Sequence, residues 1–312
     1  MRLGPAGKEF FFHVVLTLSL FLSISFIPLA GFLLGILTPL PTVLALIRNG
    51  IRSAWLVPAA AGAAGVLLLS ALGMLHSVPY LIILLCMGTV MGYGIREEWT
   101  SAKVVGISAL ILAAASGLVF AFAYLETGGE VVHAIEQDLQ ATISGAVKQF
   151  GSESAETQAL ESSLLASVPI MVRIMPGITV SSALGIPWLN LLVVRRYCWR
   201  MAFEFCVREN LKCWKAPEAF VWPVIASGLI LLLPFGNLQI VALNVLIVFG
   251  TIYFFQGLAI AAFYFEKWNM PLFLRSLIYV ILVLQQFASV AIAVVGLFDM
   301  WFDFRRMAKK PA

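Results

Sequence analysis

The feature that most constrains this chain is the length of its stretches without Asp, Glu, Lys or Arg. Residues 10–47, 53–95 and 219–265 each run uncharged for about twice the roughly 20 residues that a helix needs to cross a bilayer core. Residues 104–125 and 276–298 form single stretches, and 166–194 is interrupted only by Arg173. Turn-forming residues at Pro28, Pro79 and Pro234 divide the long runs. These patterns predict an all-α, polytopic transmembrane bundle with eight to nine spans.

Composition supports a membrane protein and excludes several other classes. Charged residues make up 12% of the chain and hydrophobic residues 61%, whereas soluble domains devote about a quarter of their residues to charge. A secreted enzyme, a nucleic-acid-binding domain and a disordered chain are therefore excluded. The net charge of +4 indicates membrane orientation, and we expect no nucleic-acid partner. The four cysteines are scattered and contain no C-x-x-C pair, so we expect neither a disulfide framework nor a metal site.

The basic residues fall in connections that alternate along the chain, which predicts the orientation. If the first eight spans alternate, the N-terminus, the turn near Arg48, the loop with Arg96 and the segment 195–215 lie on one side. Cytoplasmic loops retain Lys and Arg, so this side is the cytoplasm. The loop between residues 126 and 161 lies outside and contains seven acids against the base Lys148. A multi-pass protein with a cytoplasmic N-terminus is predicted.

The basic C-terminal tail conflicts with simple alternation, which would place Arg305 and Arg306 outside. One interpretation makes the last apolar segment re-entrant or interfacial, with its bend at Gln285-Gln286. The other leaves the tail outside because earlier spans fix the topology. The charge bias favours a cytoplasmic tail.

The outer loop is predicted to contain an amphipathic helix. Val131, Ile135, Leu139, Ile143 and Val147 recur every four residues, which is a helical spacing. Residues 151–154 then interrupt the pattern. Such a helix would rest on lipid or cover the mouth of a cavity.

We divide the chain into three parts. Residues 1–196 form a six-span bundle that includes the outer loop 126–165. Residues 197–218 form a cytoplasmic basic segment at the membrane interface. Residues 219–312 contain a transmembrane hairpin, a terminal apolar segment and the basic tail.

Polar groups within the spans are the candidate substrate contacts: Arg173, Asn190, Gln256 and Asn244. A charge inside a span is costly and often functional, although Arg173 lies near enough to the outer border to reach lipid phosphates. The amides have the alternative role of bonding across helices. Pro176-Gly177 and Pro187 suggest that the span containing Arg173 is kinked or broken.

No catalytic motif is present in the sequence. It lacks H-E-x-x-H, G-x-S-x-G, a Walker lysine loop and an intramembrane carboxylate pair. We therefore expect no enzyme activity and no cofactor, and active transport would need an ion gradient or an energised partner.

Several motifs suggest a family. Residues 214–218 (Trp-Lys-Ala-Pro-Glu), Gln256-Gly257, and Gly296 to Asp299 followed by Trp301 and Arg305 resemble the bacterial YybS-like inner-membrane proteins along the whole chain. This resemblance implies location in the bacterial inner membrane. Residues 10–196, with Pro39-Leu40-Pro41, are similar to S components of energy-coupling-factor transporters. That similarity implies a small-molecule solute and energy-coupling subunits as partners. The alanine-rich contact motif of those S components is absent, and extra spans follow Arg196.

The segment 195–218 is a second candidate surface, because it mixes bases with aromatic residues. We expect an interfacial helix that binds anionic lipid or a partner through Arg195, Arg196, Arg200, Trp214 and Lys215. Two functions follow. The first is solute binding or transport through a pocket near Arg173, Asn190 and the outer loop. The second is a membrane scaffold or assembly factor that acts through the cytoplasmic basic surface.

Overall fold

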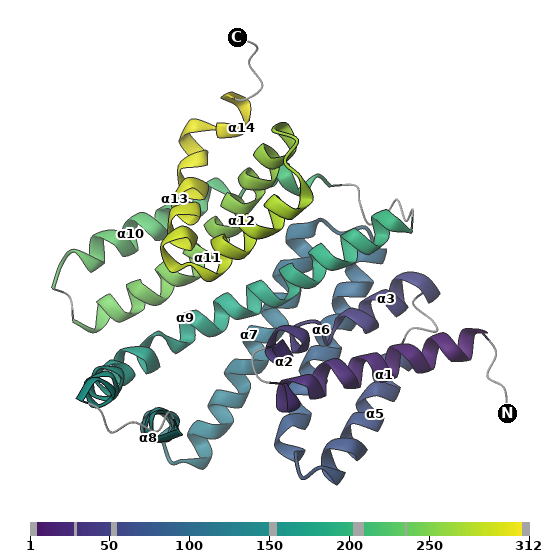
Figure 1. Cartoon of the computed structure of the whole chain (residues 1–312), viewed down its shortest axis with the longest axis horizontal. Helices are drawn as coiled ribbons and strands as arrows, with labels where there is room; N and C mark the ends of the chain where they lie inside the picture. Colours follow the sequence, from purple (N-terminus) through teal and green to yellow (C-terminus); the bar gives the residue numbers. More distant parts are fainter. Residues whose placement is uncertain are drawn as a thin grey trace. The chain divides into compact units, whose positions relative to one another are not determined.

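The structure is a computed structural model of the chain, and it describes residues 5–27, 30–50, 55–149, 155–201, 209–234 and 236–307. In these ranges all regular structure is helical, as predicted (Figure 1). The helical outcome has a direct physical cause. Apolar segments that leave water must satisfy every backbone N–H and C=O internally, and a single segment achieves this only as a helix.

The chain divides into two compact units, which are described separately. The first unit contains Met1–Ala115 and Ser182–Leu211. Its complete helices are α1 (Pro5–Phe26), α2 (Ala30–Gly35), α3 (Leu40–Asn49), α5 (Leu56–Ala71) and α6 (Val78–Arg96), with the short 3-10 helix η1 (Leu75–Ser77) before α6. The beginning of α7 (Ser101–Glu126) and the end of α9 (Ala155–Arg200) complete it.

The second unit contains Ser116–Ser181 and Lys212–Ala312. It holds the end of α7, the helix α8 (Val131–Gln149) and the first part of α9. After the 3-10 helices η3 (Leu211–Cys213) and η4 (Glu218–Phe220) come α10 (Val221–Leu231), α11 (Asn237–Lys267), α12 (Leu272–Leu284), α13 (Gln286–Phe302) and α14 (Phe304–Met307). These units cut α7 and α9 rather than the chain at residues 196 and 218, so the three-part division stays a prediction based on sequence.

Six helical segments of the described chain are long and apolar enough to cross a membrane, and α12 with α13 makes a seventh if the bent pair counts as one span. The apolar helices Leu56–Ala71 and Glu218–Leu231 are shorter than a full span. The eight to nine spans are therefore not confirmed by helix length. The sequence count assigned a full span to each of these two segments because it measured uncharged residues, and turns occupy part of them.

Two predicted local features are present in the structure. The loop between the spans forms α8, in which Ile135, Leu139 and Ile143 are partly buried while Gln137 and Asp138 are exposed. The pair α12 and α13 bends by 98°, and the break falls at Gln285-Gln286 as the re-entrant interpretation requires.

Two glycines of G-x-x-x-G pairs, Gly31 and Gly88, lie at helix contacts. A Cβ added to Gly31 would overlap the carbonyl of Ser23 in α1, and one added to Gly88 would press on Pro39 before α3. Small residues at these positions let the backbones of neighbouring membrane helices approach closely.

The span with Arg173 was expected to be kinked or broken, and the break is absent: α9 runs continuously from Ala155 to Arg200 through Pro176 and Pro187. A proline leaves one carbonyl of a helix without its usual donor, but neighbouring helices can satisfy the freed backbone groups of a membrane span. Pro176 frees the carbonyl of Val172, and Asn244 of α11 bonds the next pair of the helical ladder, Arg173 and Gly177, as described below.

Candidate functional site: a buried polar network at the end of α13

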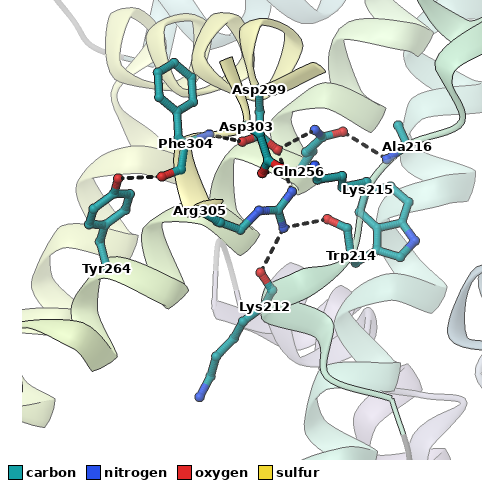
Figure 2. A network of polar contacts seen from close by, with 10 residues as sticks. All are labelled: Lys212, Trp214, Lys215, Ala216, Gln256, Tyr264, Asp299, Asp303, Phe304 and Arg305. Carbon is teal, nitrogen blue, oxygen red and sulfur yellow. Dashed lines mark hydrogen bonds and ion pairs between the residues drawn. The ribbon is translucent and has the colours of Figure 1, made fainter. Parts of the chain in front are cut away.

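The polar network in the second unit is centred on the Asp299–Arg305 ion pair (Figure 2). Nη2 of Arg305 lies 2.5 Å from Oδ2 of Asp299. The Asp299 side chain is completely buried, and that of Arg305 is 6% exposed. The other carboxylate oxygen, Oδ1, accepts a hydrogen bond of 2.9 Å from the backbone N–H of Phe304. The carboxylate thus receives a counter-charge and backbone hydrogen bonding in place of water.

Gln256 of α11 extends this network to the loop before α10. Its Nε2 donates to Oδ2 of Asp299 at 3.1 Å, and its Oε1 accepts from the backbone N–H of Ala216 at 2.9 Å. Gln256 is also completely buried. The amide therefore joins α13 to the loop through its two ends, and both of its polar atoms have partners.

Arg305 binds the same loop through two backbone carbonyls. Its Nη1 donates to the carbonyls of Lys212 and Trp214, at 2.8 and 2.9 Å. The hydroxyl of Tyr264 in α11 donates to the carbonyl of Phe304 at 3.0 Å. As Figure 2 shows, residues distant in sequence converge on one carboxylate and one guanidinium.

Two exposed ion pairs lie at the rim of the network. Lys215 is 3.1 Å from Asp303, and Lys212 is 2.6 Å from Glu266. The hydrogen bond from Lys215 is the main cause that lowers the pKa of the Asp303 carboxyl below its ordinary value. Exposed pairs of this kind contribute about 1 kcal/mol or less, so the buried pair dominates the energetics of the site.

The local sequence explains how Asp299 reaches Gln256. Gly296 lies one turn before Asp299, and Gly257 follows Gln256; a Cβ on either glycine would overlap a carbonyl oxygen of the facing helix. These two glycines let α13 approach α11 closely. Asp303 then ends α13 in the left-handed region, at φ 42°, which turns the chain so that Arg305 points back to Asp299.

The geometry of this site suits a structural clamp. Removing a charge from water is costly unless it is paired and hydrogen-bonded, and here one ion pair fixes α11, α13 and residues 212–216 together. Among the described residues no cluster of three His, Cys, Asp or Glu is arranged to hold a metal ion.

The predicted substrate contacts Asn244 and Arg173 meet through the backbone. The side chain of Asn244 accepts from the N–H of Gly177 at 2.5 Å and donates to the carbonyl of Arg173 at 2.9 Å. These two backbone groups are the i and i−4 partners of one helical hydrogen bond. Asn244 therefore bridges the ladder of α9 next to Pro176, while the Arg173 side chain is exposed.

Asn190 belongs to the first unit, where it is completely buried. Its Nδ2 donates to the carbonyls of Ile36 and Ile186, each at 2.9 Å. Gln256 and Asn244 are twelve positions apart on α11, which places them about 18 Å apart along the axis. These two amides are therefore not parts of one site, and a substrate role for any of the four residues stays a prediction.

Two shallow hollows occur on the described surface of the second unit. One of about 410 Å³ is lined by Gln137, Gln140, Ala141, Ser144 and Leu165. The other, of about 350 Å³, is lined by Val294, Val295, Phe298, Phe302 and Phe304. Neither includes a predicted substrate contact.

The predicted partner surface divides between different environments. Arg195 is half-buried and donates to Ser101 Oγ at 3.3 Å and to the carbonyl of Glu209. Arg196 and Arg200 are exposed at the end of α9, and the Arg196 guanidinium lies 5.1 Å from the ring centroid of Trp199.

The expectation of one interfacial helix over 195–218 was wrong where the structure describes it. The helix α9 ends at Arg200, and residues 209–217 are irregular apart from the short η3. Residues 202–208 lie outside the described ranges. Trp214 and Lys215 belong to the polar network, through the Trp214 carbonyl and the Lys215 ammonium.

Sequence reasoning missed the central pair, although Asp299 and Arg305 both belong to the motif that suggested a family. The available signal was the close sequence spacing of Asp299, Asp303 and Arg305 after an apolar segment. That spacing did not reveal that Gln256, on another helix, contacts the same carboxylate.

Comparison with known proteins places the chain in a family. No curated protein and no solved structure matches it. One family model, described as "Predicted membrane protein (DUF2232)", matches residues 15–300. The matched region overlaps every candidate span and includes the network residues up to Asp299. The chain is therefore a membrane protein that belongs to the DUF2232 family of predicted membrane proteins.

Proposed function

We propose that this protein binds a small solute within the bilayer and moves it across the membrane. The observation that carries the proposal is the interruption of two membrane segments at mid-length. Residues 30–49 divide into α2 and α3, and residues 272–302 divide into α12 and α13. Non-helical backbone at membrane depth is tolerated where it is enclosed by protein or lines a cavity, and transporters place solute sites at such breaks.

The polar groups at the second break are partly satisfied by the chain itself, which supports insertion into the membrane. The hydroxyl of Ser289 donates to the carbonyl of Leu282 at 2.7 Å. Leu284 and Phe287 beside the break are 79% and 81% exposed. An apolar tip with an internally bonded carbonyl is suited to a hairpin that enters the bilayer and returns.

A re-entrant hairpin reconciles the basic tail with the orientation of the other loops. Arg305 bonds the carbonyl of Lys212, so the end of α13 and the loop before α10 share one side of the membrane. Glu209 precedes Lys212 by three residues, and a stretch of that length reaches about 10 Å at most. The Glu209 carboxylate accepts a hydrogen bond from the backbone N–H of Ser101 at the start of α7. In this topology the bases of these connections, and the N-terminus, face the cytoplasm of a bacterial inner membrane.

The span count depends on the two short helices. If α5 and α10 cross together with their flanking turns, the chain has eight full spans besides the re-entrant hairpin. This topology agrees with the lower end of the sequence-based count. An S-component-like coupling to energy-coupling subunits remains a proposal that rests on the likeness of residues 10–196.

The solute test is a thermal-shift screen of the purified protein against vitamins, nucleobases and other small metabolites. A binding protein is expected to unfold at a higher temperature with its solute, because a ligand of the folded state stabilises it. If the solute is an anion held by Arg173, Arg173→Ala abolishes this shift, whereas the matched control Arg306→Ala retains it. Absence of any stabilising solute, together with absence of uptake in cells that express the protein, would contradict transport.

A second candidate function is a membrane scaffold that acts through its cytoplasmic surface. The specific observation in its favour is the buried Asp299–Arg305 pair, which fixes residues 212–216 against the end of α13. Within the second unit the fixed residues 212–216 display Lys215, and within the first unit Arg196 and Arg200 are exposed at the end of α9. Exposed bases of this kind suit an acidic partner or anionic lipid. Charge reversal at Arg196 and Arg200 is expected to disturb a scaffold while leaving solute stabilisation unchanged.

A further inference from the structure

Three buried polar side chains of the first unit contain oxygen atoms that find no hydrogen-bond partner among the described residues. They are Oγ1 of Thr42, Oγ of Ser108 and Oδ1 of Asn190. Each of the three residues is completely buried. Buried polar atoms are nearly always bonded, because leaving water without a replacement partner costs free energy. Three such oxygens in one unit therefore need an explanation.

The oxygen of Asn190 is held in a fixed direction. Both hydrogens of its Nδ2 are used by the carbonyls of Ile36 and Ile186, so the amide cannot turn over without losing two hydrogen bonds. Ile36 lies in the break between α2 and α3. The free Oδ1 can only accept a hydrogen bond or bind a cation. It is thus a preorganised acceptor beside a broken membrane segment.

Ser108 and Asn190 occupy the same level of the first unit. Arg195 in α9 bonds Ser101 at the start of α7, and the two helices lead away from this contact in opposite chain directions. Ser108 is seven residues from the contact and Asn190 five, which correspond to about 10 and 8 Å along the helix axes.

Hydrophobic packing also places these residues at one level. One apolar cluster contains Val104 and Val194, and the other contains Leu112 and Ala183. Ser108 therefore lies between the two clusters on α7, and Asn190 lies between them on α9.

Thr42 and the break reach this level from α3. Asn190 bonds the carbonyl of Ile36 in the break. Val43, which follows Thr42, packs in the same apolar cluster as Val104 of α7 and Leu191 of α9. This level of the first unit thus contains the hydroxyls of Ser108 and Thr42, the fixed amide oxygen of Asn190 and the backbone of the break between α2 and α3. We define Thr42, Ser108 and Asn190 as the polar layer.

We propose that the polar layer binds an alkali-metal cation. Its free atoms are neutral oxygens, which suit a hard monovalent ion, and no carboxylate of the described chain belongs to the layer, as a divalent site would favour. Unwound carbonyls beside half-helices coordinate such ions in membrane transporters. The proposal rests on the solute-transport function and deepens it, since a cation that binds together with the solute couples transport to the gradient of that ion across the membrane. It is tested by binding alone, so it can fail while solute binding stands.

The experiment measures the unfolding temperature of the purified full-length protein in sodium chloride, potassium chloride and choline chloride at equal ionic strength. Sodium or potassium is expected to raise the unfolding temperature by at least about 3 °C relative to choline, because choline is too large for a site inside the helix bundle. The same unfolding temperature in all three salts would overturn the proposal. Internal water would then be the partner of the free oxygens.

Matched variants separate a cation site from general packing. Thr42→Val and Ser108→Ala remove one hydroxyl each with little change in shape, and removing an unbonded buried hydroxyl does not destabilise the protein in choline. At least one of these variants is expected to lose the rise caused by the cation. The control is Thr89→Val, because the buried Thr89 hydroxyl already donates to the carbonyl of Leu85 at 2.7 Å. Retention of the rise in both test variants, or its loss in the control, would overturn the site.

Discussion

At the residue scale, the stability of the second unit depends on the interactions that replace water around the buried Asp299 carboxylate. Arg305 supplies the counter-charge, Gln256 a hydrogen bond and Phe304 a backbone N–H. Removing one partner of a buried pair leaves an uncompensated charge, which costs more than the pair itself contributes.

The first prediction concerns this pair. Asp299→Asn leaves the Arg305 guanidinium buried without its counter-charge, so we expect a loss of about 3 to 5 kcal/mol of unfolding free energy. Asp303→Asn removes only the exposed pair with Lys215, and about 1 kcal/mol or less is expected. Unfolding of both variants in detergent, measured by thermal shift and by denaturant, compares them. An equal loss in the two variants would contradict the clamp.

The second prediction concerns pH. The pKa of Asp303 is lowered from 3.8, chiefly by the hydrogen bond from Lys215, so the folded state binds the proton more weakly than the unfolded state. The stabilisation is therefore complete above about pH 5 and is lost as the pH falls through the lowered pKa. The difference in unfolding temperature between the wild type and Asp303→Asn should be small but measurable at neutral pH and should vanish in acid. A difference that grows in acid would contradict this sign.

At the element scale, the contact between α11 and α13 positions the network. Backbone approaches backbone at Gly257 and Gly296, and this closeness allows Gln256 to reach Asp299. The sequence could predict that these helices exist and that small residues mark contacts. It could not predict which helix faces which, because G-x-x-x-G and similar spacings occur on many membrane helices and carry no information about the partner.

The third prediction tests this crossing. Gly257→Ala and Gly296→Ala each place a Cβ against a carbonyl oxygen of the other helix, and we expect destabilisation of about 1 to 3 kcal/mol or more. Gly250→Ala in α11 meets no atom within 4 Å. This control should be neutral or slightly stabilising, because alanine favours helix more than glycine does. The unfolding temperatures of the three variants and the wild type are compared in one detergent. An unchanged unfolding temperature for Gly257→Ala would contradict the close approach of α11 and α13.

At the scale of the whole molecule, uncharged runs located the apolar helices because the cost of burying charge in lipid acts on every span alike. They did not fix the number of spans, since six or seven helical segments are long enough to cross rather than eight to nine. The break at Gln285-Gln286 belonged to one of the two interpretations of the last apolar segment, and the bend of α12 against α13 falls there. The continuity of α9 through Pro176 was not predictable. Nor was the contact beside it, in which Asn244 of the distant α11 bonds α9.

The same limit applies to the candidate site. Gln256 was recognised as an amide in an apolar segment, and Asp299 and Arg305 as parts of one family motif. Their meeting depends on the fold of residues 212–216 and on Asp303 in the left-handed region. Long-range pairing of this kind has no periodic signature in a single sequence, whereas helix length and amphipathicity do.

The central claim is topological: the basic connections and the C-terminal end share the cytoplasmic side, with α12 and α13 forming a hairpin that returns. Accessibility of single cysteines to a membrane-impermeant maleimide on intact cells tests it most directly, in a variant from which the native cysteines have been removed.

A cysteine at Ser144 in α8 should be labelled from outside, whereas cysteines at Glu98 and Arg306 should react only after the membrane is opened. Labelling at Arg306 in intact cells would contradict the re-entrant hairpin, and protection at Ser144 would contradict the orientation of the whole chain.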